Sequence, residues 1–223
     1  MRKSIVTPDN RYVIFPNPDY YGDFQVAEAK TMAIVHIIEI GGSHRAACIV
    51  ALPDCQHVVI RNHDAYHLQE DTLRVFNIIT GQGVRDCDFE AVGNPYVTPD
   101  NRYIIFTFKF GYGVAVWDWQ AGPKAKILFS QGLEECTINT LNSDGSKVVV
   151  THYPATLPPA VKYKNPTLRV WDLETGKNTC SFTGYRNAIA LFDKRKIKAV
   201  GTEAGVWKIL DIENGIVEGV LNT

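Results

Sequence analysis

The sequence predicts an all-β fold built from five copies of one four-stranded unit. Two ladders of similar segments recur along the chain with a period of about 45 residues, and each unit contains short apolar runs bounded by turn residues. No stretch shows apolar positions at helical spacing across about 11 residues, so we expect few helices. A fixed period decides the architecture because each unit buries its apolar face against its neighbours.

The first ladder is a turn containing an aspartate between two short apolar runs. Its clearest copies are residues 6–15 and 97–106, which share the segment Val-Thr-Pro-Asp-Asn-Arg-Tyr. The turn aspartates of the five copies are Asp9, Asp54, Asp100, Asp144 and Asp193. Aspartate favours such turns because its side chain can accept a hydrogen bond from the backbone two residues further on. This ladder places the first and second strands of every unit.

A second ladder marks the third and fourth strands of each unit. It consists of an apolar run, an acidic or amide residue, and a glycine where the turn needs a positive φ. The runs end at Glu39, Asn77, Asp118, Asp172 and Asp211, and the glycines are Gly42, Gly81, Gly122, Gly176 and Gly215. Four antiparallel strands in about 45 residues make one blade of a β-propeller, so a propeller is the predicted architecture.

Several segments of these ladders carry a family likeness. They are Leu-Arg-Val-Trp-Asp-Leu-Glu-Thr-Gly at 168–176, Val-Trp-Asp at 116–118 and the Thr-Pro-Asp-Asn-Arg-Tyr turns. Through them the chain resembles the WD-repeat β-propellers over almost its whole length and, more narrowly, the propellers of NACHT-type WD-repeat regulatory proteins. The likeness implies a non-catalytic protein-interaction scaffold or, for the narrower match, a regulatory sensor domain whose nucleotide site lies outside this chain.

The sequence departs from that family in motif and in number. The Asp that usually stands six residues before the Trp is replaced by Gly111 and Asn165, and the usual Gly-His dipeptide is missing. The family commonly closes a ring of seven blades, whereas this chain holds five. Its approximate blades are 4–45, 46–91, 92–135, 136–185 and 186–223. We therefore expect a single propeller domain or a fragment of a larger propeller, which would self-associate if its end blades are open.

The charge balance excludes several classes of partner. The chain has 23 Lys and Arg against 24 Asp and Glu, so no global field attracts nucleic acid or an anionic membrane. The basic run at 194–198 occupies a predicted turn, where solvated charge is the simpler explanation. The five cysteines are odd in number and scattered, and no apolar signal segment opens the sequence. We expect a cytoplasmic protein that binds neither nucleic acid nor membrane.

Long connections between the second and third strands are rich in aromatic residues and proline. In a four-stranded meander these connections share one face, while the short turns share the other. Rings on loops held by a rigid scaffold suit protein recognition, although the loops could instead fold back and bury their own rings. The residues predicted to bind a protein partner of unknown identity are Tyr20, Tyr21, Tyr66, Phe110, Tyr112, Tyr153 and Tyr163.

The sequence shows no nucleophile elbow, no phosphate-binding glycine loop and no zincin histidine pair, so we expect no enzyme activity and no cofactor. A metal site is not expected either, because the nearest donors are spread along a strand. That set is Cys48, Cys55, His57, His63 and His67. Asp86 and Asp88 lie on an outer fourth strand and are interpreted as solvated charges. The alternative function is a propeller enzyme or small-molecule-binding propeller, which requires acids or histidines to converge in the central channel.

Overall fold

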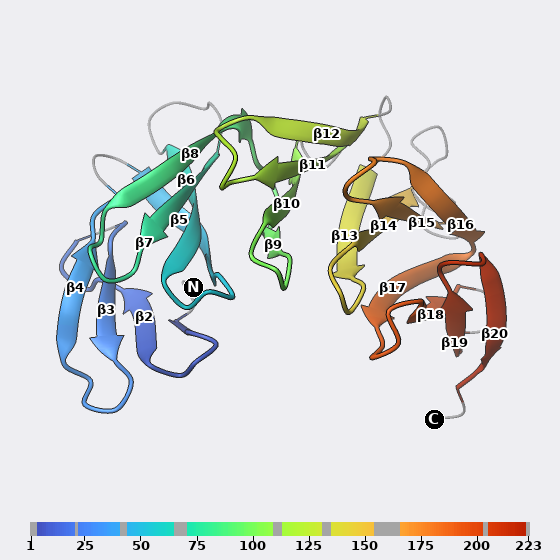
Figure 1. The fold of residues 1–223 in the computed structure, drawn as a ribbon, viewed down its shortest axis with the longest axis horizontal. Helices are drawn as coiled ribbons and strands as arrows, with labels where there is room; N and C mark the ends of the chain where they lie inside the picture. Colours follow the sequence, from blue (N-terminus) through green and yellow to red (C-terminus); the bar gives the residue numbers. More distant parts are fainter. Residues whose placement is uncertain are drawn as a thin grey trace. The chain divides into compact units, whose positions relative to one another are not determined.

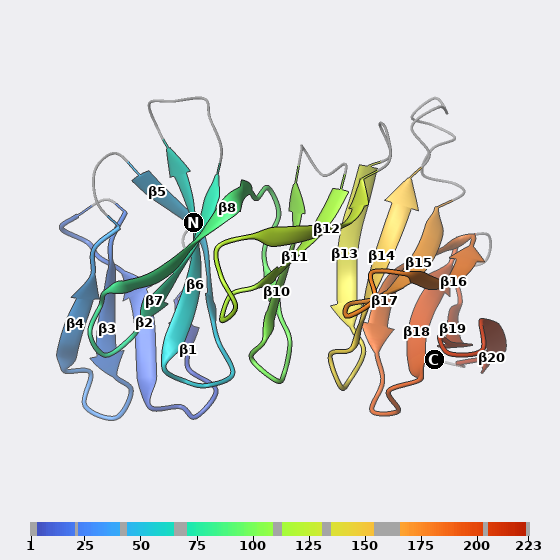
Figure 2. The ribbon, with the colours of Figure 1, turned by 45° about the horizontal axis from the view of Figure 1, so that its top comes forward.

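The computed structural model describes residues 4–20, 22–40, 44–64, 71–108, 113–130, 135–153, 166–202 and 205–221. These residues form five four-stranded sheets and no helix, and hence none that could cross a membrane (Figure 1). In Figure 2 the strands of each sheet lie side by side. The predicted all-β fold of five four-stranded antiparallel units, the architecture of a β-propeller, is confirmed.

The chain folds as two compact units. The first unit is Met1–Ile105 with Trp117–Ala125, and the second is Phe106–Val116 with Lys126–Thr223. The first unit contains two complete sheets. Their strands are β1 (Ile5–Val6), β2 (Tyr12–Pro16), β3 (Phe24–Glu28), β4 (Ile34–Ile38), β5 (His44–Ala51), β6 (His57–Asp64), β7 (Thr72–Asn77) and β8 (Gly83–Glu90).

The third sheet contributes residues to both units, and the last two sheets belong to the second unit. The strands of the third sheet are β9 (Tyr96–Val97), β10 (Tyr103–Phe108), β11 (Gly113–Asp118) and β12 (Ala125–Ser130). Those of the last two are β13 (Glu135–Leu141), β14 (Lys147–Tyr153), β15 (Thr167–Asp172), β16 (Asn178–Thr183), β17 (Tyr185–Ala190), β18 (Lys196–Gly201), β19 (Trp207–Asp211) and β20 (Ile216–Val220).

Each unit has an apolar core between consecutive sheets. In the first unit Ile14 and Phe24 of the first sheet pack with Ile60 and Phe76 of the second, and all four side chains are fully or almost fully buried. Burying one such side chain contributes about 1.5–3 kcal/mol, so face-to-face sheet packing is the main stabilising force. In the second unit the equivalent core joins the fourth and fifth sheets.

The aspartate turns close as the first ladder predicts. Asp9 accepts the backbone N–H of Arg11 at 3.1 Å and the hydroxyl of Thr7 at 2.6 Å. The turn in the copy at residues 97–106 repeats this arrangement, and its Asn101 has a φ of 62°. Asparagine tolerates this left-handed conformation better than most residues. Local chemistry therefore fixes where each inner strand turns back.

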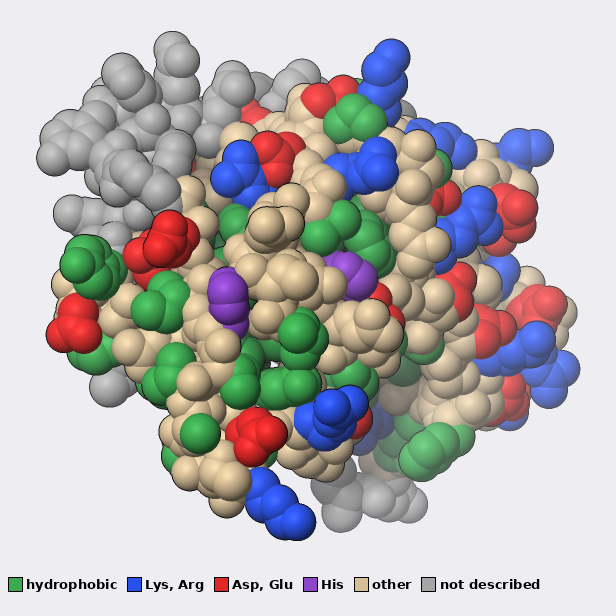
Figure 3. All heavy atoms as spheres, turned by 60° about the vertical axis from the view of Figure 1, so that its left-hand side comes forward, with side chains coloured by type: hydrophobic (Ala, Val, Ile, Leu, Met, Phe, Trp, Pro, Cys, Tyr) green, Lys and Arg blue, Asp and Glu red, His purple; other side chains and the backbone are tan. Residues whose placement is uncertain are grey.

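The fourth, outer strand carries a β-bulge in four of the sheets. Register shifts leave one residue unpaired at this bulge in each of β4, β8, β16 and β20, and β8 has a second shift between Asp86 and Glu90. The outer strand β4 also exposes Ile34, Val35 and Ile37. Figure 3 views this side of the molecule and shows hydrophobic side chains at the surface among charged ones. A bulge increases the local twist and re-aims neighbouring side chains, so each sheet has an irregular outer edge at the same place.

Candidate functional site

An aspartate and a histidine form a hydrogen-bonded pair at the turn between β5 and β6. Nδ1 of His57 lies 2.8 Å from Oδ2 of Asp54. The turn brings them together because Cys55 adopts a φ of 58° and its N–H donates to the carbonyl of Leu52. The second carboxylate oxygen of Asp54 accepts the backbone N–H groups of Gln56 at 2.9 Å and His57 at 3.0 Å. The carboxylate is thus held by the backbone of its own turn.

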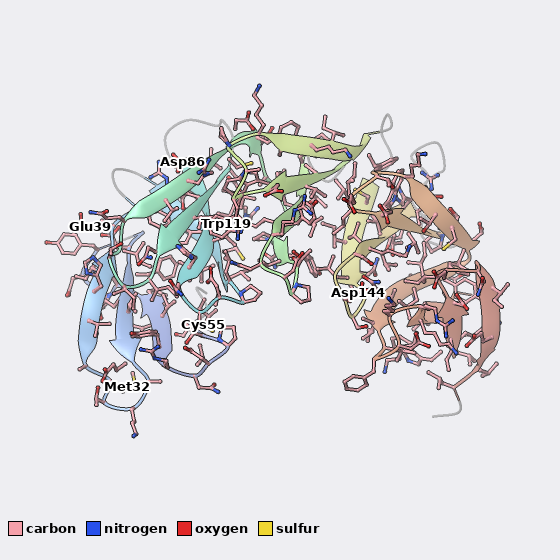
Figure 4. All side chains as sticks on the ribbon, viewed as in Figure 1. Met32, Glu39, Cys55, Asp86, Trp119 and Asp144 are labelled. Carbon is pink, nitrogen blue, oxygen red and sulfur yellow. The ribbon has the colours of Figure 1, made fainter. Side chains whose placement is uncertain are left out.

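Two residues of the third sheet complete this cluster, and all four belong to the first compact unit. The side chain of Asn101 donates from Nδ2 to Oδ2 of Asp54 at 2.7 Å. The backbone carbonyl of Asn101 accepts the indole N–H of Trp119 at 2.8 Å. The Trp119 ring lies 5.2 Å from the His57 ring, tilted by 55°. Figure 4 labels Trp119 and Cys55 in this region. The four residues Asp54, His57, Asn101 and Trp119 are called the Asp54–His57 cluster below.

The electrostatics of the cluster favour the ionised form of Asp54. Burial by itself raises the pKa of the Asp54 carboxyl, but hydrogen bonds from Gln56 and His57 outweigh it and hold that pKa below its usual value. An ionised carboxylate can only accept hydrogen bonds, so Nδ1 of His57 carries the proton. The other ring nitrogen, Nε2, has no hydrogen-bond partner among the described residues.

The cluster is partly accessible. The side chains of Asp54 and His57 are 22% and 18% exposed, so solvent reaches a ring that is otherwise held on one edge by a carboxylate and contacted by an indole. A histidine oriented by a carboxylate is suited to accept a proton at its other ring nitrogen. The arrangement can therefore perform general-base chemistry.

The structure describes two of the seven predicted partner-binding residues. Tyr20, in the connection between β2 and β3, is 66% exposed, and Tyr153, at the end of β14, is half-buried. The other five residues, Tyr21, Tyr66, Phe110, Tyr112 and Tyr163, lie outside the described residues. Their role stays a prediction.

Sequence reasoning missed the Asp54–His57 pair although the signal was present. His57 follows the turn aspartate of the second blade by three residues, but it was considered only as a metal donor with the nearby cysteines. In the described part of the chain no three His, Cys, Asp or Glu side chains come together as a metal site would require. Asp86, interpreted as a solvated charge, has a side chain that is 57% exposed and is also paired with Arg74.

Surface clefts lie elsewhere in the first unit. One, of about 500 Å³, is lined by Asn10, Arg11, Tyr12, Glu28, Ala29 and Lys30. Another, of about 560 Å³, is lined by Arg74, Gly83, Val84, Arg85, Asp86 and Pro123. Neither includes the Asp54–His57 pair.

No family model and no curated protein matches the chain. Among solved structures it is similar to an oligogalacturonate lyase in complex with manganese, with a TM-score of 0.68 and 14% identity over 97% of this chain. It is also similar to the dihydro-heme d1 dehydrogenase NirN in complex with DHE (TM-score 0.67, 15% identity, 99% of this chain). A third is the hydrazine synthase of Kuenenia stuttgartiensis (TM-score 0.60, 13% identity, 99% of this chain). The chain spans 63% of the lyase, 47% of NirN and 72% of the synthase.

These comparisons correct three expectations. The assignment to the WD-repeat and NACHT-type regulatory propellers is wrong, because no such family model matches and the similar structures, the lyase and NirN, are enzymes. The expectations of a non-catalytic scaffold and of no enzyme activity are corrected by the same finding. The physical reason lies in the Trp-Asp segments. Asp172 accepts the Thr175 N–H at 2.8 Å and Asp118 accepts that of Ala121 at 3.1 Å, which is turn chemistry that any four-stranded blade can use.

Proposed function

We propose that this chain is the propeller of an enzyme that acts on a small molecule, with His57 as the proton acceptor and Asp54 as the residue that positions it. The observation that carries the proposal is the 2.8 Å contact between Nδ1 of His57 and an ionised carboxylate, while Nε2 of the ring has no hydrogen-bond partner among the described residues. The shared fold with two enzymes supports an enzymatic role by analogy.

The proposed step is a proton transfer to Nε2 of His57. As the ring accepts the proton it becomes positively charged, and the carboxylate of Asp54 stabilises that charge through the hydrogen bond to Nδ1. Asn101 keeps the carboxylate in place, and Trp119 contacts the ring and limits its rotation. General-base assistance of this kind typically contributes about 10²–10⁴-fold to a rate.

The oligogalacturonate lyase suggests the first substrate class to test. A base that removes the proton from a carbon next to a carboxylate can start an elimination, in which the electron pair forms a C=C bond and the glycosidic oxygen leaves with its bonding pair. The departing oxygen takes a proton from solvent. Here Nε2 of His57 would be the base. The lyase was solved with manganese, and the described residues of this chain show no cluster of three metal-binding side chains.

The test is an elimination assay on oligogalacturonate, followed by the ultraviolet absorbance of the conjugated product. We expect turnover by the full chain, a loss of about 10²–10⁴-fold in kcat for His57→Gln, and a smaller loss for Asp54→Asn, because the ring keeps a base but loses its orientation. His36→Gln is the matched control, since His36 is also half-buried in the first unit and lies outside the cluster. Turnover that His57→Gln leaves unchanged would refute the proposed role of the pair.

A further inference from the structure

A cleft on the outer edge of the second sheet contains two arginines. It is lined by Arg74 of β7, residues 83–86 of β8 and Pro123 of the connection between β11 and β12, and is called the Arg85 cleft below. All these residues belong to the first unit. The N–H of Asp88 donates to the carbonyl of Pro123 at 3.0 Å, which fixes the Pro123 wall against β8.

A bulge in β8 explains why four consecutive residues line one hollow. Phe76 pairs with Gly83 and Val75 pairs with Arg85, so Val84 has no partner in β7. In a regular strand successive side chains point to opposite faces, whereas a bulge twists the strand and re-aims its neighbours. Gly83 adds space, because it carries no side chain where Arg74 and the bulge meet.

Arg85 is specific to this sheet and does not follow from the blade repeat, whereas Arg74 has an equivalent in Arg169 of the fourth sheet. The residues that hold the place of Arg85 beside the bulge in the other three bulged strands are His36, Cys180 and Gly219. Those that hold the place of Asp86 are Ile37, Ser181 and Val220. The scaffold tolerates uncharged or small residues at both places, so folding does not require an arginine here.

The two arginines differ in how their charge is balanced. Arg74 makes a two-point ion pair with Asp86, in which Nη2 lies 2.6 Å from Oδ2. Arg85 has no carboxylate partner among the described residues, and its Nε is buried without a hydrogen bond. A buried guanidinium nitrogen without an acceptor is unfavourable. The lining residues therefore carry one more positive than negative charge.

We propose that the Arg85 cleft binds the carboxylate of a small organic monoanion such as a hexuronate. The planar guanidinium of Arg85 matches a carboxylate in a two-point arrangement, and the single net charge suits one carboxylate better than a phosphate dianion, which Asp86 would repel. Val84 and Pro123 offer apolar walls for the C–H face of a sugar ring. The cleft is a binding site separate from the Asp54–His57 cluster, and the inference does not depend on the proposed catalytic role.

The test compares galacturonate with galactose, which differ only in the carboxylate, in calorimetric titrations of the full chain at low ionic strength. We expect galacturonate to bind and galactose and inorganic phosphate to bind at least about tenfold more weakly. Arg85→Gln should weaken galacturonate binding about tenfold or more, and Arg85→Lys should fall between, because it keeps the charge but loses the planar fork.

One control variant separates this site from the other cleft. Arg11→Gln removes a cation there and should leave galacturonate binding unchanged. A thermal melt of each variant checks that it is folded. Equal binding of galactose, tighter binding of phosphate, or galacturonate binding that a folded Arg85→Gln variant retains in full would overturn the proposal.

Discussion

Lowering the pH should destabilise the second unit through one buried histidine, His152. The side chain of His152, on β14, is 2% exposed, and the ring of Phe129 contacts it at 4.3 Å in an edge arrangement. Burial lowers the pKa of His152 to about 3, and the nearby charge of Arg169 acts in the same direction. The folded protein therefore holds this imidazole neutral throughout the physiological pH range.

The sign and size of the effect follow from the two states. In the unfolded chain His152 has its ordinary pKa of about 6.5, so below that pH the unfolded state binds a proton at His152 and the folded state does not. Stability is complete above about pH 6.5 and falls by about 1.4 kcal/mol for each pH unit towards 3. At pH 5 the loss is about 2 kcal/mol, a substantial part of the 5–15 kcal/mol typical of a folded domain.

Urea denaturation of wild type and His152→Leu at pH 7.5, 6 and 5 measures the contribution of His152 to the pH dependence of the unfolding free energy. Other titrating groups are common to both proteins, so they cancel in the difference between the two unfolding free energies. We expect that difference to shift by about 2 kcal/mol in favour of the variant between pH 7.5 and 5. Parallel stability curves over this range would refute the conclusion that the folded state excludes the proton from His152.

Three further substitutions or reactions test local features. Gly81→Ala should lower the free energy of unfolding by about 2 kcal/mol or more, because the φ of Gly81 is 67° and a Cβ there would meet the His36 ring. Gly122→Ala is the control: a Cβ at Gly122 meets nothing, so this substitution should change stability little. Burial raises the pKa of the Cys87 thiol to about 12, so a thiol reagent at pH 8 should label it only after denaturation; labelling of the native protein would contradict this burial. Asn101→Ala should lower the free energy of unfolding by about 1–2 kcal/mol in chemical denaturation. The variant loses the hydrogen bond to Asp54, and alanine tolerates the backbone φ of 62° less well than asparagine does. An unchanged denaturation midpoint would count against that hydrogen bond.

The sequence by itself determined the blade pattern and its turns. Aspartate turns such as Asp9 and glycine turns such as Gly176 depend on contacts within about five residues, so their chemistry is readable along the chain. The same locality explains the mistaken family assignment, because the Trp-Asp segment at 171–172 reports turn formation rather than ancestry. Gly122 was also expected at a positive φ, but its turn closes without one.

Only the tertiary structure decided where chemistry is placed. Asp54 meets Asn101, and His57 meets Trp119, because turns of two different sheets lie next to each other, and such long-range contacts leave no period in the sequence. The Arg85 cleft depends on a bulge, which shifts the strand register by one residue without a sequence signature of its own. Local backbone preferences therefore specify the blades, while packing between blades and register irregularities select the residues that can act together.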